Sequence, residues 1–460
     1  MGEPRSSKSI IATNQGDFMN SKSGNTGAVI GCDLAPDLQL NLNVRGLPPS
    51  ATLAINERSD RLAGQGVKVY KMGLGQSPFP VPEIIVDELK RNAFQKDYLP
   101  VKGLLELRRA VAEHHRRTFG IECTEDDVLI GPGSKELMFI LQLVYYGDIV
   151  IPTPAWVSYA PQAQIIGRQI RLLHTKAENG WRLTPEQLDE LCRSDPSRPR
   201  IVVLNYPSNP TGTTYGLEEL RAIAEIASRY RVILLSDEIY GQLHHEDNHH
   251  SIVPIYPEGT IFSGGLSKWC GAGGWRLGLF VFPKCLRWLQ DAMAVVASET
   301  FTATSAPIQY AAISAYQESE EIDWYLYQVK RILRSIGRKL VTLFNPTKVH
   351  VLSPHGAFYL FPDFKEYGER LKCLDITTSR EFCEHLLKET GIAMLPGMDF
   401  GRAPEELTAR LAYVNFDGKK ALEAANQIPA SLFLDDNFLY SYCAGPIVAT
   451  ENLCRWLESL

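Results

Sequence analysis

Polar segments that follow short apolar runs carry the side chains that could do chemistry in this chain. They hold a lysine amine, carboxylates, a phenol, amides and a Gly-rich turn, in the segments Gly131 to Lys135, Pro152 to Trp156, Asn205 to Gly212, Asp237 to Tyr240 and Ser263 to Lys268. Ligands of open α/β sheets bind beyond the carboxyl ends of the strands, so these segments should converge on one crevice. The sequence therefore predicts a single ligand site made of ionisable and hydrogen-bonding groups.

The apolar runs before these segments predict the sheet that positions them. They are Val128 to Ile130, Ile149 to Ile151, Ile201 to Leu204, Val232 to Leu235, Ile261 to Phe262 and Leu279 to Phe282. Short, continuous β-branched runs that alternate with helical patterns are typical of strands buried on both faces of a mostly parallel sheet. We therefore expect an α/β fold with a large, mostly parallel-sheet domain.

Further patterns predict helices and a second, smaller domain. Amphipathic helices are expected at Glu83 to Phe94, Gly103 to Phe119 and Glu321 to Phe344. Later, short strands at Ala357 to Phe361 and Leu411 to Val414, with a helix around Ser379 to Glu389, indicate a smaller α+β domain.

The expected domain boundaries follow from these patterns. We expect a flexible leader over residues 1–40, an arm with part of the small domain over 41–80, the large domain over 81–325, the small C-terminal domain over 326–430, and an extension over 431–460. The leader is rich in Ser, Gly and Asn. In the extension, the spacing of Leu453, Trp456 and Leu457 predicts a helix that docks on the small domain or on a dimer partner.

Composition excludes several classes of protein. The 460 residues include 47 Lys and Arg against 53 Asp and Glu, with 45% hydrophobic side chains, as in an ordinary folded protein. The sequence has neither a local basic patch for nucleic acid nor about 18 consecutive apolar residues for a membrane span. The nine scattered cysteines predict free thiols in a reducing compartment, the cytoplasm.

Several motifs in series resemble the class I/II aminotransferases, and most of all aspartate-aminotransferase-like enzymes of fold type I. The main ones are NYPSNPTG, SDEIYG, SGGLSK and GGWRLG, and the similarity extends from about Asn43 to about Gly418. It includes GLGQSPFPVP, YLPVKG, HGAFYLFPD, LPGMDFG and ARLAY. The resemblance implies a homodimeric enzyme that uses pyridoxal 5'-phosphate.

The resemblance also assigns the catalytic groups, which would be Lys268, Asp237 and Tyr240. Lys268 would hold the cofactor as a Schiff base, and Asp237 would keep the ring nitrogen protonated. Tyr240 and Asn209 would donate to the phenolic oxygen and lower the basicity of the Schiff base. Trp156 would lie against the ring face.

For the phosphate, the resemblance implies a turn, an arginine and a tyrosine. The turn is Gly133, Ser134 and Lys135, whose backbone N–H groups would open a helix. Arg276 would add a guanidinium, and Tyr98 would reach over from the partner subunit.

One position departs from the pattern of the family. Gly265 stands where many relatives have a phosphate-binding serine, three residues before the lysine. Ser267 or Ser263 would have to replace that serine, and we assign Ser267 to the cofactor site.

Substrate binding is implied in the same way. Arg410 in ARLAY would grip the α-carboxylate and orient the Cα–H bond, with the Gly75 backbone beside it. Asn209 and Trp156 would line the same space. Lys135 stands where relatives that recognise dicarboxylates have a lysine, which favours aspartate or a similar acid.

These assignments predict a ping-pong transamination from an L-amino acid to a 2-oxo acid, 2-oxoglutarate. The alternatives are an aromatic or other neutral amino acid as donor, a pyridoxal-phosphate-dependent lyase or cyclase, and, more remotely, a non-catalytic sensor that binds the cofactor. No metal is expected. The histidines His244, His245, His249 and His250 are irregularly spaced, which favours a solvated loop over a metal site.

Overall fold

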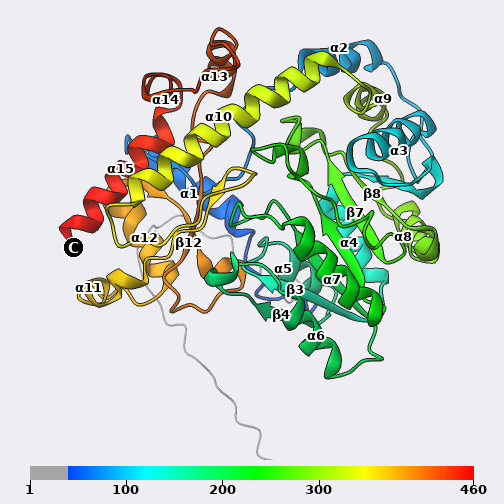
Figure 1. Ribbon diagram of the computed structural model, residues 1–460, viewed down its shortest axis with the longest axis horizontal. Helices are drawn as coiled ribbons and strands as arrows, with labels where there is room; N and C mark the ends of the chain where they lie inside the picture. The colour runs from blue at the N-terminus through cyan, green and yellow to red at the C-terminus, as the bar shows by residue number, and fades with distance from the viewer. Residues whose placement is uncertain (1–39) are drawn as a thin grey trace, which may run out of the picture. The chain divides into compact units, whose positions relative to one another are not determined.

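A mixed seven-stranded sheet forms the core of the larger part of the molecule (Figure 1). In order across the sheet, its strands are β2 (Val128–Gly131), β8 (Gly278–Val281), β7 (Thr260–Gly265), β6 (Ile233–Asp237), β5 (Arg200–Asn205), β3 (Asp148–Thr153) and β4 (Ile170–His174). Neighbouring strands are parallel except where β8 pairs with β2 and β7. The predicted α/β fold with a mostly parallel sheet is confirmed.

The computed structural model describes residues 40–460. The expected leader, residues 1–40, therefore lies outside the described residues except for its last residue. Cys32 also lies outside them. Residues 1–42 and 43–460 are separate units, and the second unit contains the large sheet. In the part of the chain that is described, no helix combines the length and the apolar character that a membrane crossing requires.

Helices cover both faces of the sheet and bury its inner strands. On β5, Ile201 and Val203 pack in one apolar cluster, whereas Val202 and Leu204 pack in another. Successive side chains of a strand point to opposite faces, so the central strands are continuously apolar. The first cluster is covered by α4 (Ser134–Val144), α5 (Tyr159–Ile165) and α8 (Arg287–Ser298), and the second by α6 (Pro185–Arg193) and α7 (Leu217–Arg229).

β4 is the strand of the large sheet that the sequence patterns missed. It lies at the edge of the sheet and pairs only with β3 among the described strands. Its residues Arg171, Leu172 and His174 are exposed. An edge strand with one solvated face has no continuous apolar run, so the pattern that identified the inner strands was absent here.

The smaller part is built from two short sheets and several helices. One sheet pairs β1 (Tyr70–Lys71) with β10 (Ile392–Ala393), and the other has the order β11 (Leu395–Pro396), β12 (Ala409–Ala412), β9 (Tyr359–Leu360). Its helices are α1 (Ala51–Gly64), α10 (Glu320–Phe344), α11 (Gly368–Lys372), α12 (Ser379–Thr390) and α13 (Gly418–Ala425). Beside the large sheet, α9 (Ala306–Ala315) packs on both α2 (Glu83–Asn92) and α3 (Leu105–Phe119).

The C-terminal residues form α14 (Asp436–Tyr442) and α15 (Ala444–Ser459). α15 lies alongside α10 and also contacts α12 and β1 (Figure 1). Leu453 and Leu457 are fully buried in the same apolar cluster as Leu340 of α10. The tail thus completes the core of the smaller part.

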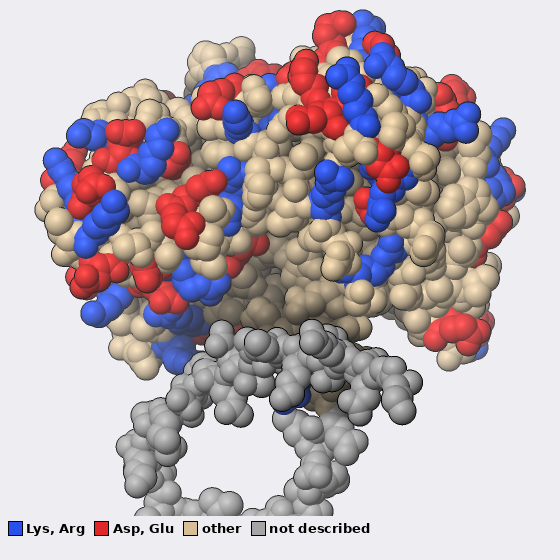
Figure 2. Space-filling view, turned by 90° about the horizontal axis from the view of Figure 1, so that it is seen from below, with Lys and Arg blue, Asp and Glu red and all other residues tan. Residues whose placement is uncertain are grey.

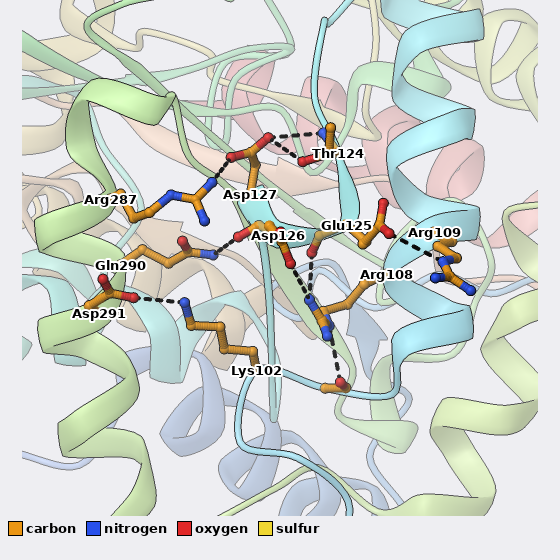
Figure 3. A network of polar contacts seen from close by, with 11 residues as sticks. Lys102, Arg108, Arg109, Thr124, Glu125, Asp126, Asp127, Arg287, Gln290 and Asp291 are labelled. Carbon is orange, nitrogen blue, oxygen red and sulfur yellow. Dashed lines mark hydrogen bonds and ion pairs between the residues drawn. The ribbon is translucent and has the colours of Figure 1, made fainter.

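A polar network holds the start of β2 against α8 and α3 (Figure 3). The Asp127 carboxylate accepts a 2.6 Å hydrogen bond from Nη2 of Arg287 in α8. Lys102 Nζ donates to Asp291 of the same helix at 2.7 Å. Arg108 of α3 donates from Nε to the carbonyl of residue 103 at 3.1 Å. The loop before α3 is therefore tied to two helices.

Charged side chains of both signs are interspersed on the face shown in Figure 2. This mixture is what the nearly balanced composition, with a formal net charge of -6, predicts. Charged side chains also form ion pairs among the described residues, as Arg338 and Arg334 do with Glu246.

We predict that Leu453→Ala lowers the free energy of unfolding by about 2–5 kcal/mol, because the substitution removes a fully buried side chain and leaves a cavity. The measurement is urea-induced unfolding followed by circular dichroism. Glu458→Ala, at an exposed position of the same helix, serves as the control and should change the stability by less than about 0.5 kcal/mol. Equal effects of the two substitutions would show that the tail is not part of the core.

Candidate active site

A cavity of about 450 Å³ lies where β5 and β6 end, with Asn205 and Asp237 in its wall. Segments distant in the sequence meet there, as expected for the carboxyl edge of a parallel sheet. The cavity is lined by these predicted site residues: Gly75, Ser134, Lys135, Trp156, Asn209, Asp237, Tyr240, Ser267, Lys268, Arg276 and Arg410.

Two predicted residues, Gly133 and Tyr98, do not line this cavity. Gly133 precedes α4 with φ +92°, and a Cβ atom at this position would lie 2.3 Å from Nη2 of Arg276. Glycine therefore lets the guanidinium close against the start of the helix. Tyr98 is 92% exposed, so within one chain its side chain stays outside the site.

The Asp237 carboxylate is buried and held by hydrogen bonds to both oxygens. Tyr159 donates from its hydroxyl to Oδ2 at 2.6 Å, and Ser263 donates to Oδ1 at 3.3 Å. Burial raises the pKa of Asp237 to about 6, whereas these two donors oppose the rise. Ser263 thus holds the acid, whereas Ser267 is the one of these two serines that lines the cavity.

Tyr159 is a site residue that the sequence reasoning missed. It begins α5, three residues after Trp156, and the two rings pack edge to face with centroids 5.2 Å apart. An aromatic pair at this spacing just beyond a strand was the available signal. The partner of the hydroxyl, Asp237, is 78 residues away, and only the folded chain reveals it.

The Lys268 amine is buried and faces the same cavity. Its Nζ donates to the Gly75 carbonyl oxygen at 2.8 Å. Burial lowers the pKa of Lys268 to about 8, with the Arg410 charge acting in the same direction and Asp237 opposing the change. The amine therefore loses its proton more readily than an ordinary lysine, as a nucleophile or base requires.

Arg410 is a buried cation, and one N–H group of its guanidinium has no acceptor among the described residues. Nη1 donates to Asn209 Oδ1 at 2.9 Å, and Nη2 donates to the carbonyl of residue 73. Its Nε finds no hydrogen-bond partner among the described residues. The guanidinium packs over the rings of Tyr359 and Phe400, at 4.8 Å and 5.1 Å. A buried cation with an unsatisfied N–H favours an anionic ligand.

This set of groups fits pyridoxal 5'-phosphate. Lys268 offers a buried amine for the aldehyde, and Asp237 a fixed anion for the ring nitrogen. The start of α4 and Arg276 offer N–H donors and positive charge for the phosphate. Trp156 offers a planar face beside them.

The prediction of a solvated loop is wrong for three of the four histidines. His244 and His245 are buried, and the side chain of His249 is only 5% exposed. His249 Nε2 lies 2.7 Å from Oε2 of Glu238, a buried carboxylate that also accepts a hydrogen bond from Ser251. The buried acid needs hydrogen-bond donors, which brings His249 inside. His245 Nε2 in turn lies 3.0 Å from the carbonyl oxygen of Ala357, 112 residues away.

Comparisons with known proteins cover most of the chain. A family model described as aminotransferase class I and II matches residues 67–428. An aspartate aminotransferase of Geobacillus stearothermophilus is 34% identical over 398 residues, which are 84% of this chain and 97% of the relative. A solved structure of Thermus thermophilus aspartate aminotransferase with maleate matches with a TM-score of 0.77 at 27% identity, over 91% and 99% of the two chains. The aromatic aminotransferase from Pyrococcus horikoshii gives 0.71 at 28% identity, over 87% and 98%.

We predict that the cofactor-free protein takes up pyridoxal 5'-phosphate faster as pH rises through about 8. Only an unprotonated Lys268 amine attacks the aldehyde, and its pKa is about 8. The measurement is the rate at which visible absorbance develops between about pH 7 and about pH 9. Lys330→Ala, a lysine of α10 that pairs with Asp247, should leave the profile unchanged. A flat profile in the unaltered protein would contradict the proposed environment of the amine.

Proposed function

The chain belongs to the class I and II aminotransferases, and we propose that it moves the amino group of aspartate, or of a similar acidic L-amino acid, to 2-oxoglutarate. One observation carries this choice of substrate. Besides Arg276 at the phosphate end and the Lys268 amine that would bind the aldehyde, the cavity is lined by two basic side chains, Arg410 and Lys135. Two cations in one substrate cavity suit an amino acid with two carboxylates.

The chemistry divides between the cofactor and the chain. Pyridoxal 5'-phosphate, when bound, supplies the electron sink that stabilises negative charge at the substrate Cα. Arg410 binds the α-carboxylate and so orients the Cα–H bond. The Lys268 amine, with its lowered pKa, would move the proton from the substrate Cα to the carbon that carried the cofactor's aldehyde, and would move a proton in the opposite direction in the second half of the reaction. Asp237 holds a fixed negative charge at the floor of the site.

Lys135 has the position and the environment expected of a group that binds the substrate side chain. It is the second residue of α4, and its ammonium group lies 5.6 Å from the centroid of the Trp156 ring. Burial lowers the pKa of Lys135, and the Arg276 charge adds to this effect. A carboxylate beside Lys135 would offset both costs, so an acidic substrate and this lysine stabilise each other.

Aromatic amino acids are the second candidate class of substrate. Leu53 and Leu74 line the same cavity and give it an apolar wall. One of the similar solved structures is named an aromatic aminotransferase. A substrate panel separates the two classes.

We further propose a homodimer in which Tyr98 completes the phosphate site of the partner. The supporting observation is that Tyr98 projects into solvent at 92% exposure from a loop that Lys102 ties to Asp291. An exposed aromatic side chain on an anchored loop is suited to an interface. Sedimentation of the protein with its cofactor should give the mass of two chains, and the mass of one chain would refute the proposal.

The cytoplasm is the compartment we propose. The eight cysteines within the described residues are free thiols, and six of them are buried. Free thiols persist in a reducing compartment.

We predict that Lys135→Met lowers kcat/KM for aspartate about 10–100-fold, because a charge-assisted contact with the side-chain carboxylate is lost. The value for phenylalanine should stay within about threefold. Initial rates with a panel of amino acids and 2-oxoglutarate measure both.

Lys268→Ala is the matched control and should abolish turnover of every donor, because no amine remains for the aldehyde. If Lys135→Met leaves aspartate turnover intact, the acidic substrate is wrong while the aminotransferase activity stands. Release of ammonia without an acceptor oxo acid would indicate a lyase instead.

A further inference from the structure

The hydroxyl groups of two buried tyrosines meet at the edge of the cavity. Tyr240 follows β6 of the large sheet, and Tyr359 lies in β9 of the small sheet, 119 residues further along the chain. Their oxygens are 2.7 Å apart, and both residues line the cavity. This distance is that of an ordinary hydrogen bond, in which one of the two hydroxyl groups donates to the other.

Tyr359 is held on three sides, so its hydroxyl has little freedom to move. A Cβ atom at Gly75 would lie 2.0 Å from the Tyr359 hydroxyl oxygen, so only glycine allows this approach. The face of the Tyr359 ring lies 4.8 Å from the Arg410 guanidinium carbon. Tyr359 therefore touches the groups expected to bind the cofactor (Tyr240) and the substrate (Arg410), and the backbone of residue 75, to which Lys268 donates.

The hydrogen bond between the two hydroxyl groups can run in either direction, which gives the pair two possible arrangements. If Tyr359 donates to Tyr240, the proton of Tyr240 is free to point into the cavity, toward the cofactor's phenolic oxygen. If Tyr240 donates to Tyr359, the Tyr240 proton lies between the two tyrosines and cannot be donated to the cofactor. The choice decides whether Tyr240 can act on the cofactor.

The charges around the pair favour the first arrangement. Burial raises the pKa of both phenols, and the Arg410 charge opposes the rise in both. Arg410 packs directly against the Tyr359 ring, where it is the largest opposing cause, whereas Asp237 further raises the pKa of Tyr240 alone. The more acidic phenol is the better donor. The other charged groups nearby are the Lys268 amine, 5.6 Å from the centroid of the Tyr240 ring, and the Asp237 carboxylate.

We propose that Tyr359 is a positioning residue whose hydroxyl donates to Tyr240 and thereby directs the Tyr240 proton at the cofactor's phenolic oxygen. Hydrogen bonds in such a chain strengthen one another. Tyr359 would therefore lower the basicity of the lysine-bound cofactor by acting through Tyr240. The inference rests on the proposed function, because it takes Tyr240 as the donor to the cofactor.

The test is the pH titration of the visible absorbance of the cofactor-loaded protein in the absence of substrate. In Tyr359→Phe the ring remains under Arg410 while the hydroxyl is lost. We expect the midpoint to rise by roughly 0.5 to 1 in pH, because Tyr240 becomes a weaker donor. KM for the amino donor should stay within about threefold, because the contact with Arg410 is kept.

An unchanged midpoint would overturn the proposal, because it would show that Tyr359 only packs against its neighbours. A lower midpoint would also overturn it, because it would mean that Tyr240 donates to Tyr359 in the unaltered protein. Tyr413→Phe is the matched control: it removes a buried phenol that bonds to the Ala357 carbonyl, and the midpoint should not move.

A second substitution keeps the test open if Tyr359→Phe does not fold. Replacing Tyr359 with 3,5-difluorotyrosine makes the phenol more acidic and the donor stronger, so the midpoint should fall. A rise would refute the proposed direction of the hydrogen bond. Failure of the unaltered protein to bind pyridoxal 5'-phosphate would instead refute the proposed function, so the two failures are distinguishable.

Discussion

A lysine amine and a carboxylate share one desolvated cavity, and the rest of the structure serves to keep them there. Burial moves both toward neutrality, with the pKa of Lys268 falling to about 8 and that of Asp237 rising to about 6. For either group, a tenfold change in the acid dissociation constant corresponds to about 1.36 kcal/mol of lost stabilisation of the charged form. A ligand with a cationic ring nitrogen beside the acid and an aldehyde beside the amine relieves both costs, so the site is suited to its cofactor.

The parallel sheet explains how the large domain gathers these groups. Asn205 and Asp237 end the neighbouring strands β5 and β6, and Lys268 follows β7, which pairs with β6. Parallel neighbours end at the same edge, so strand order alone brings the three side chains together. The buried partners of Asp237, Tyr159 and Ser263, then fix the carboxylate more tightly than the backbone could.

The smaller part contributes the other half of the site. Arg410 lies in β12 and Tyr359 in the neighbouring strand β9, so one short antiparallel sheet carries both the cation for the substrate and the phenol that meets Tyr240. The carbonyls of residues 73 and 75 accept hydrogen bonds from Arg410 and Lys268. Since groups from both parts share hydrogen bonds, their relative position sets the geometry of the site.

Local patterns in the chain were enough to establish the α/β class and the inner strands, because continuous apolar runs and polar strand-end motifs can be read over a few residues. Motifs that resemble a known family supplied half of the residues that line the cavity. The hydrogen-bond partners depend on the folded chain. Tyr159 bonds to Asp237 across 78 residues, and Tyr359 meets Tyr240 across 119. The edge strand β4 and the buried histidine loop were missed for a similar reason. Their environments are set by neighbours distant in the chain, and no short stretch of sequence specifies which buried donor will satisfy which buried acceptor.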